Sequence, residues 1–404
     1  MSAIRIPSWL GFLLAVAPIF IIPICWFGFV DGDWNCIPIA DAPTVSNLQN
    51  SLVQIQIKQL KGGSTTGSGF IASFGSKKKY IVTNQHVISA PFEHGWSFTC
   101  ANGQTLEPTG MELAPDQDLA RIHYMTEGVD RTKPLFLASA APTVGRRVFA
   151  FGDPMGMAVF RRVSGKIKGI GADKVEVTCE VVSGMSGGPV VDAKTHKVVG
   201  VVTDVWKAAD ANWVYDGTEF SQKSRPRAER ISATTPWERV PSSLFFNQSR
   251  RLVDEQTFCR AFLRCLELSE QAAKGWTEDM FHDPGIAREM DRYIEYIERV
   301  NLKRSLEGAS KLFQSLDNRL SRVNRELAET EWCSSFLREQ SDEFRNLIIP
   351  HVQAKCHEIV VVIAPYVEQE RRINCTNKKC RNGMISYRDI NGNQVHRPCP
   401  VCNE

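Results

Sequence analysis

Short runs of β-branched and aromatic residues fill the chain between about residues 46 and 205, and each run ends at Gly, Asn or Asp. Examples are GSGFIASF at 67–74, RRVFAFG at 146–152 and KVVGVVTDV at 197–205. Many short strands at close spacing are typical of a sandwich or barrel. This part of the chain is therefore predicted to be all-β.

The amino-terminal segment 9–30 has a different character, because no Asp, Glu, Lys or Arg occurs between Arg5 and Asp31. A membrane-spanning helix needs roughly 20 apolar residues. A cleaved signal peptide remains the alternative, although its apolar region is usually shorter and ends at a small-residue cleavage site, which we do not find after Val30. We favour a single uncleaved anchor. Arg5 before it then places the amino terminus in the cytoplasm and the rest of the chain outside.

The net charge of +3 is close to balanced. The sequence has no basic stripe interleaved with aromatic residues, which is the usual footprint of a nucleic-acid-binding protein. Nucleic acid is therefore not expected as a partner.

The stretch SGMSGGPVV at 183–191 surrounds one serine, Ser186, with three glycines. Glycine inside a strand or helix costs about 0.5–1 kcal/mol relative to alanine, so such a cluster marks a tight turn or a close backbone approach. A serine hydroxyl becomes a nucleophile when a base removes its proton. Two upstream segments could supply a base and its partner: His86 ends a β-rich run, and Asp118 begins another.

Five motifs in this order resemble the trypsin-like serine proteases, and most closely their HtrA/DegP-type branch. They are GSGF (67–70), TNQHV (83–87), DQDLA (116–120), FGDPMG (151–156) and GMSGGPV (184–190). The resemblance covers about residues 46–246. It implies two six-stranded antiparallel β-barrels with the active site in the cleft between them.

The resemblance also implies a role for each site residue. Ser186 would be the nucleophile, His86 the general base and then acid, and Asp118 the group that orients the imidazole. The backbone N–H groups of Gly184 and Ser186 would form the oxyanion hole. Asp116 is the second candidate for the acid, but Asp118 is preferred because an apolar Leu-Ala pair follows it, as in the family.

The implied activity is that of a serine endopeptidase that cleaves protein or peptide substrates and needs no cofactor for catalysis. The alternative is a catalytically silent scaffold that keeps the protease fold. Met185 stands where many secreted trypsins carry an aspartate that pairs with a new amino terminus, which argues against activation by cleavage. The PDZ domains usual in the HtrA-type branch are not recognised here, so chaperone-like function is not carried over.

A helical region is predicted over about residues 250–370. Apolar residues recur there in heptads, at Leu302, Leu306, Ala309, Phe313, Leu316, Leu320, Val323 and Leu327. Such a seam indicates either a long helix packed in a bundle or a coiled coil that forms a homo-oligomer. A second helical run, over about residues 329–349, is predicted to stop at Pro350, from where it could fold back on the heptad helix. Another helix is predicted to open at Thr235–Pro236, after the last strand of the β-rich region.

The tail at 373–404 has too few apolar residues for a core. Its four cysteines, Cys375, Cys380, Cys399 and Cys402, are spaced like the ligands of a structural zinc site. The segment between them is predicted to be a hairpin that turns at Asn391–Gly392. We predict a zinc-ribbon-like domain, with His396 as a second-choice ligand and two disulfides as the rival arrangement.

The complete prediction is a multidomain, single-pass membrane protein with the protease domain outside the cytoplasm, in a bacterial inner membrane by its HtrA-like resemblance. The helical region and the cysteine tail would recruit substrates or partners. Zinc thiolates suit a reducing compartment, whereas an outside location favours disulfides, so the tail and the topology predictions are in tension.

Overall fold

The computed structural model describes residues 43–58, 64–74, 78–89, 96–206, 225–268, 278–300, 306–373 and 375–401. The chain forms two compact units, divided at Ser242–Ser243, with residues 89–91 grouped with the second unit. The predicted membrane span at 9–30 lies outside the described residues, as do Leu302 and Cys402 of the heptad seam and the cysteine tail.

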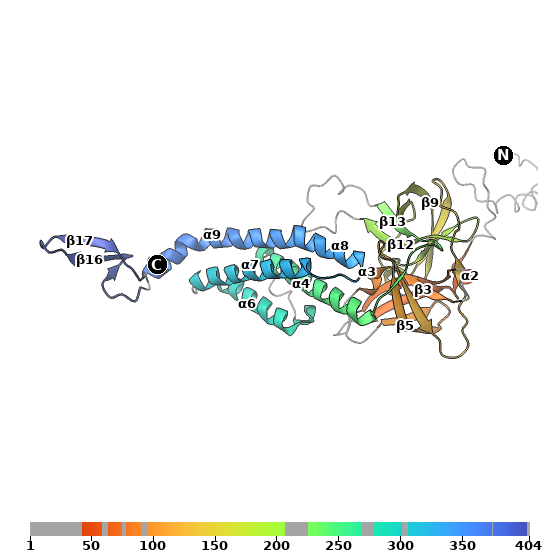
Figure 1. Cartoon of the computed structure of the whole chain (residues 1–404), viewed down its shortest axis with the longest axis horizontal. Helices are drawn as coiled ribbons and strands as arrows, with labels where there is room; N and C mark the ends of the chain where they lie inside the picture. The colour runs from red at the N-terminus through yellow and green to blue at the C-terminus, as the bar shows by residue number, and fades with distance from the viewer. Residues whose placement is uncertain are drawn as a thin grey trace, which may run out of the picture. The chain divides into compact units, whose positions relative to one another are not determined.

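Six antiparallel strands close the first barrel in the order β1-β4-β5-β6-β3-β2, and β2 pairs back to β1 (Figure 1). They are β1 (Leu52–Lys58), β2 (Ser64–Ser73), β3 (Tyr80–Thr83), β4 (Trp96–Cys100), β5 (Thr105–Leu113) and β6 (Ala120–Met125). The first strand shows why the sequence folds this way. Val53, Ile55 and Ile57 alternate with glutamines and are fully or almost fully buried, as a strand with one inward face requires.

The second barrel is closed in the order β10-β13-β12-β11-β8-β9. Its strands are β8 (Arg147–Gly152), β9 (Arg161–Ile170), β10 (Lys174–Val177), β11 (Pro189–Asp192), β12 (Val198–Trp206) and β13 (Arg225–Arg230). The predicted double β-barrel is therefore confirmed.

Strand β8 is buried on both of its faces, which joins the two barrels. Val148 and Ala150 belong to the core of the second barrel. Phe149 and Phe151, which point the other way, pack in a cluster with Phe70 of the first barrel. The alternation of small and aromatic residues in RRVFAFG thus fills one barrel with small side chains and covers the interface between barrels with large ones.

Residues 231–241 carry the chain back from the second barrel to the first. The short strand β14 (Glu238–Arg239) pairs with β5, and Trp237 packs edge-on against Phe74 with the Arg121 guanidinium 4.9 Å from its ring centre. The prediction that a helix opens at Thr235–Pro236 was wrong, since α4 begins at Ser242. Packing of Trp237 on the first barrel overrides the local helix-start signal.

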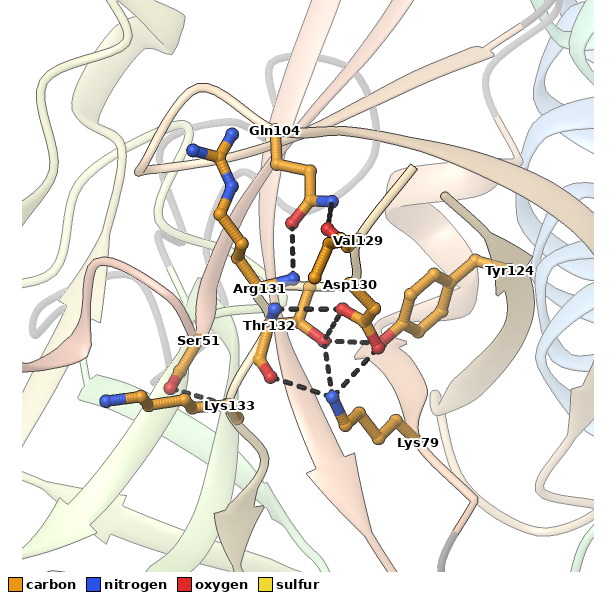
Figure 2. Close-up of polar contacts among 9 residues, drawn as sticks. All are labelled: Ser51, Lys79, Gln104, Tyr124, Val129, Asp130, Arg131, Thr132 and Lys133. Atoms are coloured by element: carbon orange, nitrogen blue, oxygen red, sulfur yellow. Dashed lines mark hydrogen bonds and ion pairs between the residues drawn. The ribbon is translucent and has the colours of Figure 1, made fainter. Parts of the chain in front are cut away.

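A polar network fixes the loop between β6 and the short strand β7 (Leu135–Phe136), which pairs with β2 (Figure 2). Lys79 Nζ lies 2.8 Å from both Asp130 Oδ2 and the Thr132 carbonyl. The Thr132 backbone N–H donates to Asp130 Oδ1, and Gln104 donates to the Val129 carbonyl. The loop is therefore held by side chains of the residues that directly precede β3 and β5.

The second unit is mainly helical. Its longer elements are α4 (Ser242–Leu268), α6 (Pro284–Val300), α7 (Leu306–Ala328), α8 (Ser335–Glu343) and α9 (Ile349–Ile373). The heptad residues of α7 from Ala309 to Leu327 are buried. Helix α9 runs beside α7 (Figure 1), and Gln353 Nε2 donates to Asp317 Oδ1 at 2.8 Å. Packing within one chain therefore accounts for the described part of the seam, as in the bundle interpretation.

The prediction that a helix stops at Pro350 was wrong. Residues Phe344–Ile348 form a π-helical stretch, η6, and α9 continues from Ile349 to Ile373 with Pro350 as its second residue. The Ile349 N–H reaches back to the Phe344 carbonyl. Proline is tolerated in the first turn of a helical segment, and the change from π- to α-helical bonding supplies such a turn.

Among the described residues, the stretch Ser335–Arg372 is the one long and apolar enough to cross a membrane. Length and composition alone do not separate a membrane span from a bundle helix, and this stretch includes the α9 face that packs on α7. It is internal, so it is not the amino-terminal anchor that the sequence predicts.

The tail forms the predicted hairpin. Strands β16 (Met384–Arg388) and β17 (Gln394–Pro398) pair antiparallel, and the short strand β15 (Cys380–Arg381) adds to β16. Gly392 has a φ of +80°, and the Asp389 carboxylate accepts the N–H groups of Asn391 and Asn393 at 2.8 Å each. The chain therefore turns at Asn391–Gly392, as the sequence predicts.

Candidate active site

His86 lies in the one-turn helix α3 (Gln85–Ile88), which follows β3 directly. Its Nδ1 is 2.5 Å from Asp118 Oδ2, and its backbone N–H donates to Asp118 Oδ1 at 2.9 Å. Both carboxylate oxygens of Asp118 therefore form hydrogen bonds with His86. This arrangement fixes the imidazole ring and favours the tautomer with a proton on Nδ1, which leaves Nε2 as the acceptor.

Asp118 lies in the turn between β5 and β6, two residues before β6 begins at Ala120. Asn84 donates to its backbone carbonyl at 2.7 Å, and the buried Gln85 donates to the carbonyl of Gln117 at 2.8 Å. The residues flanking His86 therefore hold the turn that carries the acid. Asp116 is exposed, and Asp118 is the residue that contacts His86.

Ser186 belongs to the second barrel, in the turn that precedes β11. Its Oγ donates to the backbone carbonyl of Thr203 at 3.1 Å. The Thr203 hydroxyl in turn donates to Asp118 Oδ2 at 3.0 Å. One hydrogen-bonded chain thus runs from Ser186 through Thr203 and Asp118 to His86, and it joins the predicted site residues across the two barrels.

The turn around Ser186 also presents free backbone donors. Gly184 and Gly187 have φ of +91° and +87°, in the region that favours glycine. In the part of the chain that the structure describes, neither the Gly184 N–H nor the Ser186 N–H donates a hydrogen bond. Unpaired backbone donors beside a nucleophile are the geometry of an oxyanion hole.

Close approach explains why these two positions are glycine. A Cβ on Gly184 would lie 2.5 Å from the Asp153 carbonyl oxygen, and one on Gly187 would lie 2.0 Å from the Ser68 carbonyl oxygen. Met185 between them is fully buried in the core of the second barrel. Apolar packing therefore stands where an ion pair would anchor the loop in secreted trypsins.

Sequence reasoning missed Thr203. It lies in the β-rich run KVVGVVTDV at 197–205, and a threonine in an apolar strand has no signal of its own. Its role depends on an irregularity of β12, whose pairing with β13 shifts register between Val202 and Asp204, and on the hydrogen bond that its hydroxyl makes to Asp118 of the first barrel.

Three of the four predicted metal ligands lie together. The sulfur atoms of Cys375, Cys380 and Cys399 are all within 4.8 Å of one another, and those of Cys375 and Cys399 are 3.7 Å apart. A zinc–thiolate bond is about 2.3 Å long, so the corners of a zinc tetrahedron lie about 3.8 Å apart. A disulfide would need about 2.0 Å. The three described thiols therefore fit zinc, and Cys402 lies outside the described residues.

His396 is engaged elsewhere, since its Nδ1 lies 2.7 Å from the Ser386 hydroxyl. The cluster that the structure describes consists of the three cysteines alone.

Two closed barrels, with a His–Asp pair on one and a serine in a glycine turn on the other, are the architecture of the chymotrypsin fold. Residues 67–201 match the trypsin-like peptidase domain family.

Two plant proteins are similar in sequence. Protease Do-like 5, chloroplastic, from Arabidopsis thaliana is 32% identical over 158 residues, which are 34% of this chain and 47% of that protein. Protease Do-like 1, chloroplastic, from the same plant is 26% identical over 198 residues, 45% of this chain and 42% of that protein. The chain therefore spans less than half the length of these relatives.

Among solved structures, the serine endoprotease from Yersinia pestis matches with 21% identity and a TM-score of 0.35, over 46% of this chain and 63% of that one.

Proposed function

We propose that the chain is a serine endopeptidase that hydrolyses peptide bonds of protein or peptide substrates through an acyl-enzyme. His86, Asp118 and Ser186 are its triad, and the N–H groups of Gly184 and Ser186 are its oxyanion hole. The observation that carries the proposal is the hydrogen-bonded chain from Ser186 to His86, with two unpaired amides beside it.

The proposed mechanism follows from these positions. Ser186 Oγ turns from the Thr203 carbonyl to His86, loses its proton to Nε2 and attacks the substrate carbonyl carbon. The carbonyl oxygen gains negative charge and accepts the two free N–H groups, each of which contributes about 2.7–4 kcal/mol to the transition state. His86 then donates its proton to the leaving amine. A water molecule activated by the same imidazole releases the acyl group.

Asp118 keeps its negative charge throughout the proposed reaction. It holds Nδ1–H of His86 and stabilises the imidazolium that forms when Nε2 takes the serine proton. No cofactor takes part in these steps.

A fluorophosphonate probe, which reacts with activated serines, tests the proposal. The full chain should label, and Ser186→Ala should not. Peptide hydrolysis should fall by roughly 10⁴–10⁶ in that variant, with the unfolding transition unchanged. Asp118→Asn should lose most activity, whereas Asp116→Asn, an exposed change in the same turn, should keep it. A folded wild-type chain that never labels would favour the silent scaffold instead.

The proposal extends to membrane anchoring by residues 9–30, with the protease domain outside the cytoplasm. It rests on the uncharged segment and on Arg5 before it. A topology reporter fused to the carboxyl end tests the orientation, and a cytoplasmic signal would overturn it. The helical unit and the tail would recruit substrates or partners.

The tail is proposed to hold one structural zinc ion through Cys375, Cys380, Cys399 and Cys402. The support is the 3.7 Å separation of two of the sulfurs and the small core around them, which consists of Ile385 and the cysteines themselves. Zinc would supply the folding free energy that so small a core lacks. Four cysteine ligands leave no open position, so the role is structural.

A further inference from the structure

The two peptide groups whose N–H groups form the candidate oxyanion hole each have their carbonyl fixed by a hydrogen bond. The Gly184 N–H belongs to the Ser183–Gly184 peptide, whose carbonyl accepts the Met155 N–H at 2.9 Å. The Ser186 N–H belongs to the next-but-one peptide, whose Met185 carbonyl accepts the Gly188 N–H at 3.0 Å. In a planar trans peptide the carbonyl and the N–H point in opposite directions. Fixing each carbonyl therefore aims each N–H.

The peptide between these two is held by a residue of the first barrel. Ser68 in β2 is fully buried, and its Oγ donates to the Gly184 carbonyl at 2.7 Å. Its backbone N–H donates to the Ser186 carbonyl at 2.8 Å. The Ser68 hydroxyl also accepts the Asp153 N–H at 2.8 Å, so its single proton is committed to Gly184.

The loop that carries Met155 is built around a buried carboxylate. Asp153 is fully buried, and its side chain accepts Gln54 Nε2 at 2.6 Å and the N–H groups of Ala158 and Val159 at 3.0 Å each. Met155 within this loop has a φ of +59°, a conformation that non-glycine residues adopt rarely. The surrounding hydrogen bonds hold the strained residue in place.

We propose that Ser68 and Asp153 are positioning residues of the oxyanion hole. Asp153 shapes the loop whose Met155 N–H fixes the peptide before Gly184, and Ser68 locks the peptide after it. Gly184, with a φ of +91°, has the freedom to let these peptides rotate once that support is lost. This inference rests on the proposed protease function, and it identifies a contact from the first barrel that prepares the loop of the second.

The test compares two buried serines of the first barrel. Ser51 Oγ donates to the Lys133 carbonyl at 2.6 Å, and Ser51 is buried like Ser68, but it supports the loop before β7 rather than the oxyanion hole. Ser51→Ala is therefore a matched control for the loss of one buried hydroxyl. Loss of a whole oxyanion donor lowers kcat by roughly 10²–10³.

We expect Ser68→Ala to lower kcat about 10- to 100-fold, since it misaligns donors without deleting them, with KM within about 3-fold. Affinity for a peptide aldehyde, whose hemiacetal oxygen occupies the oxyanion hole, should fall by a similar factor. Ser51→Ala should leave both quantities within about 2-fold of wild type. Equal kcat values in the two variants would overturn the proposal.

Hydrogen exchange provides a readout that does not depend on catalysis. The amides of Met185, Gly187 and Gly188 are hydrogen-bonded within this turn and its neighbouring strand. Their exchange should be faster in Ser68→Ala than in Ser51→Ala. A wild-type chain that fails to label with fluorophosphonate would defeat the protease function alone. Unchanged exchange in Ser68→Ala would defeat the positioning role alone.

Discussion

Thr203 donates its hydroxyl to Asp118 at 3.0 Å, although the two residues are 85 positions apart and lie in different barrels. Thr203 is 3% exposed, and its carbonyl accepts the Ser186 hydroxyl. One residue of the second barrel thus contacts both Asp118 and Ser186, the proposed acid and nucleophile.

Replacing Thr203 with valine keeps the shape of the side chain and removes the hydroxyl. A hydrogen bond to a charged group contributes about 1.5–3 kcal/mol. We therefore expect kcat/KM for a peptide substrate to fall about 10- to 100-fold in Thr203→Val. Thr203→Ser retains the donor and should retain most activity. Equal activity of the valine and serine variants would show that the hydroxyl does not matter.

Gly187→Ala should destabilise the protease domain strongly, because its Cβ would meet the Ser68 carbonyl oxygen at 2.0 Å and Thr83 Oγ1 at 2.2 Å. Gly103 is the matched control: its φ is +85°, but nothing lies within 4 Å of an added Cβ. Gly103→Ala should cost only the conformational strain, about 1–2 kcal/mol. Urea unfolding should show at least twice that loss for Gly187→Ala. Similar losses of unfolding free energy in the two variants would mean that the first barrel shifts to make room for the added Cβ.

The Lys79–Asp130 pair should contribute to the acid dependence of stability. Burial raises the pKa of Asp130, but hydrogen bonds from Lys79 and Thr132 outweigh burial, so the pKa lies below its ordinary value of 3.8. The unfolded chain therefore takes up the proton first as pH falls. The contribution is present above about pH 4 and is lost as pH falls through the lowered pKa.

Asp130→Asn removes this contribution. The difference in unfolding free energy between wild type and variant should be largest near neutral pH and should shrink below about pH 4. Glu112 and Asp192, whose pKa values are also lowered, are present in both proteins and cancel in the difference. Chemical unfolding from pH 7 to pH 3 measures it, and a difference that does not vary with pH would contradict the assignment.

Arg319 is expected to be the most sensitive charged residue of the helical unit. Its side chain is 8% exposed and lies between Glu255 and Glu289, at 2.9 and 2.7 Å. Removing one partner of a buried ion pair costs about 3–5 kcal/mol, because it leaves an uncompensated buried charge. Burial already raises the pKa of Glu255.

Arg251 offers a matched comparison in the same unit, since it contacts Glu326 at 2.6 Å with 43% of its side chain exposed. An exposed pair contributes about 0–1 kcal/mol. Arg319→Met should therefore lower the unfolding free energy by several kcal/mol, and Arg251→Met by less than about 1 kcal/mol. A small, equal effect of both would show that water reaches Arg319.

The chain purified under reducing conditions should contain one zinc ion, measured by native mass spectrometry or by release to a coloured chelator. Cys399→Ser should abolish binding, because Cys399 is the fully buried member of the cluster. Cys356→Ser changes a buried cysteine of α9 outside the cluster and should leave the zinc content unchanged. A folded, metal-free tail, or one with two disulfides, would contradict the zinc site.

Patterns that are local in sequence predicted the structure well. Runs such as RRVFAFG indicated strands, Asn391–Gly392 indicated a hairpin, and the heptads indicated a helix. Proline signals failed at Pro236 and Pro350, where tertiary packing and a π-helical stretch changed the local context. Short-range rules describe what a segment prefers, and they do not describe the surface on which it packs.

The supporting contacts of the site could not be predicted. Ser68 and Gly184 are 116 positions apart, and Gln54 and Asp153 are 99 apart. Their meeting depends on the closure and register of two barrels, which no single segment encodes. The motif GSGF marked the position of Ser68, but only the fold connects its hydroxyl to the turn that carries Ser186.

The path of the chain ties the two halves of the site together twice. It leaves the first barrel after β7, where Leu137 bridges Val198, and it returns through β14, which pairs with β5. If the chain were cut at one of these two connections, the other would still link the barrels. His86 and Ser186 would then remain at a high effective concentration relative to each other.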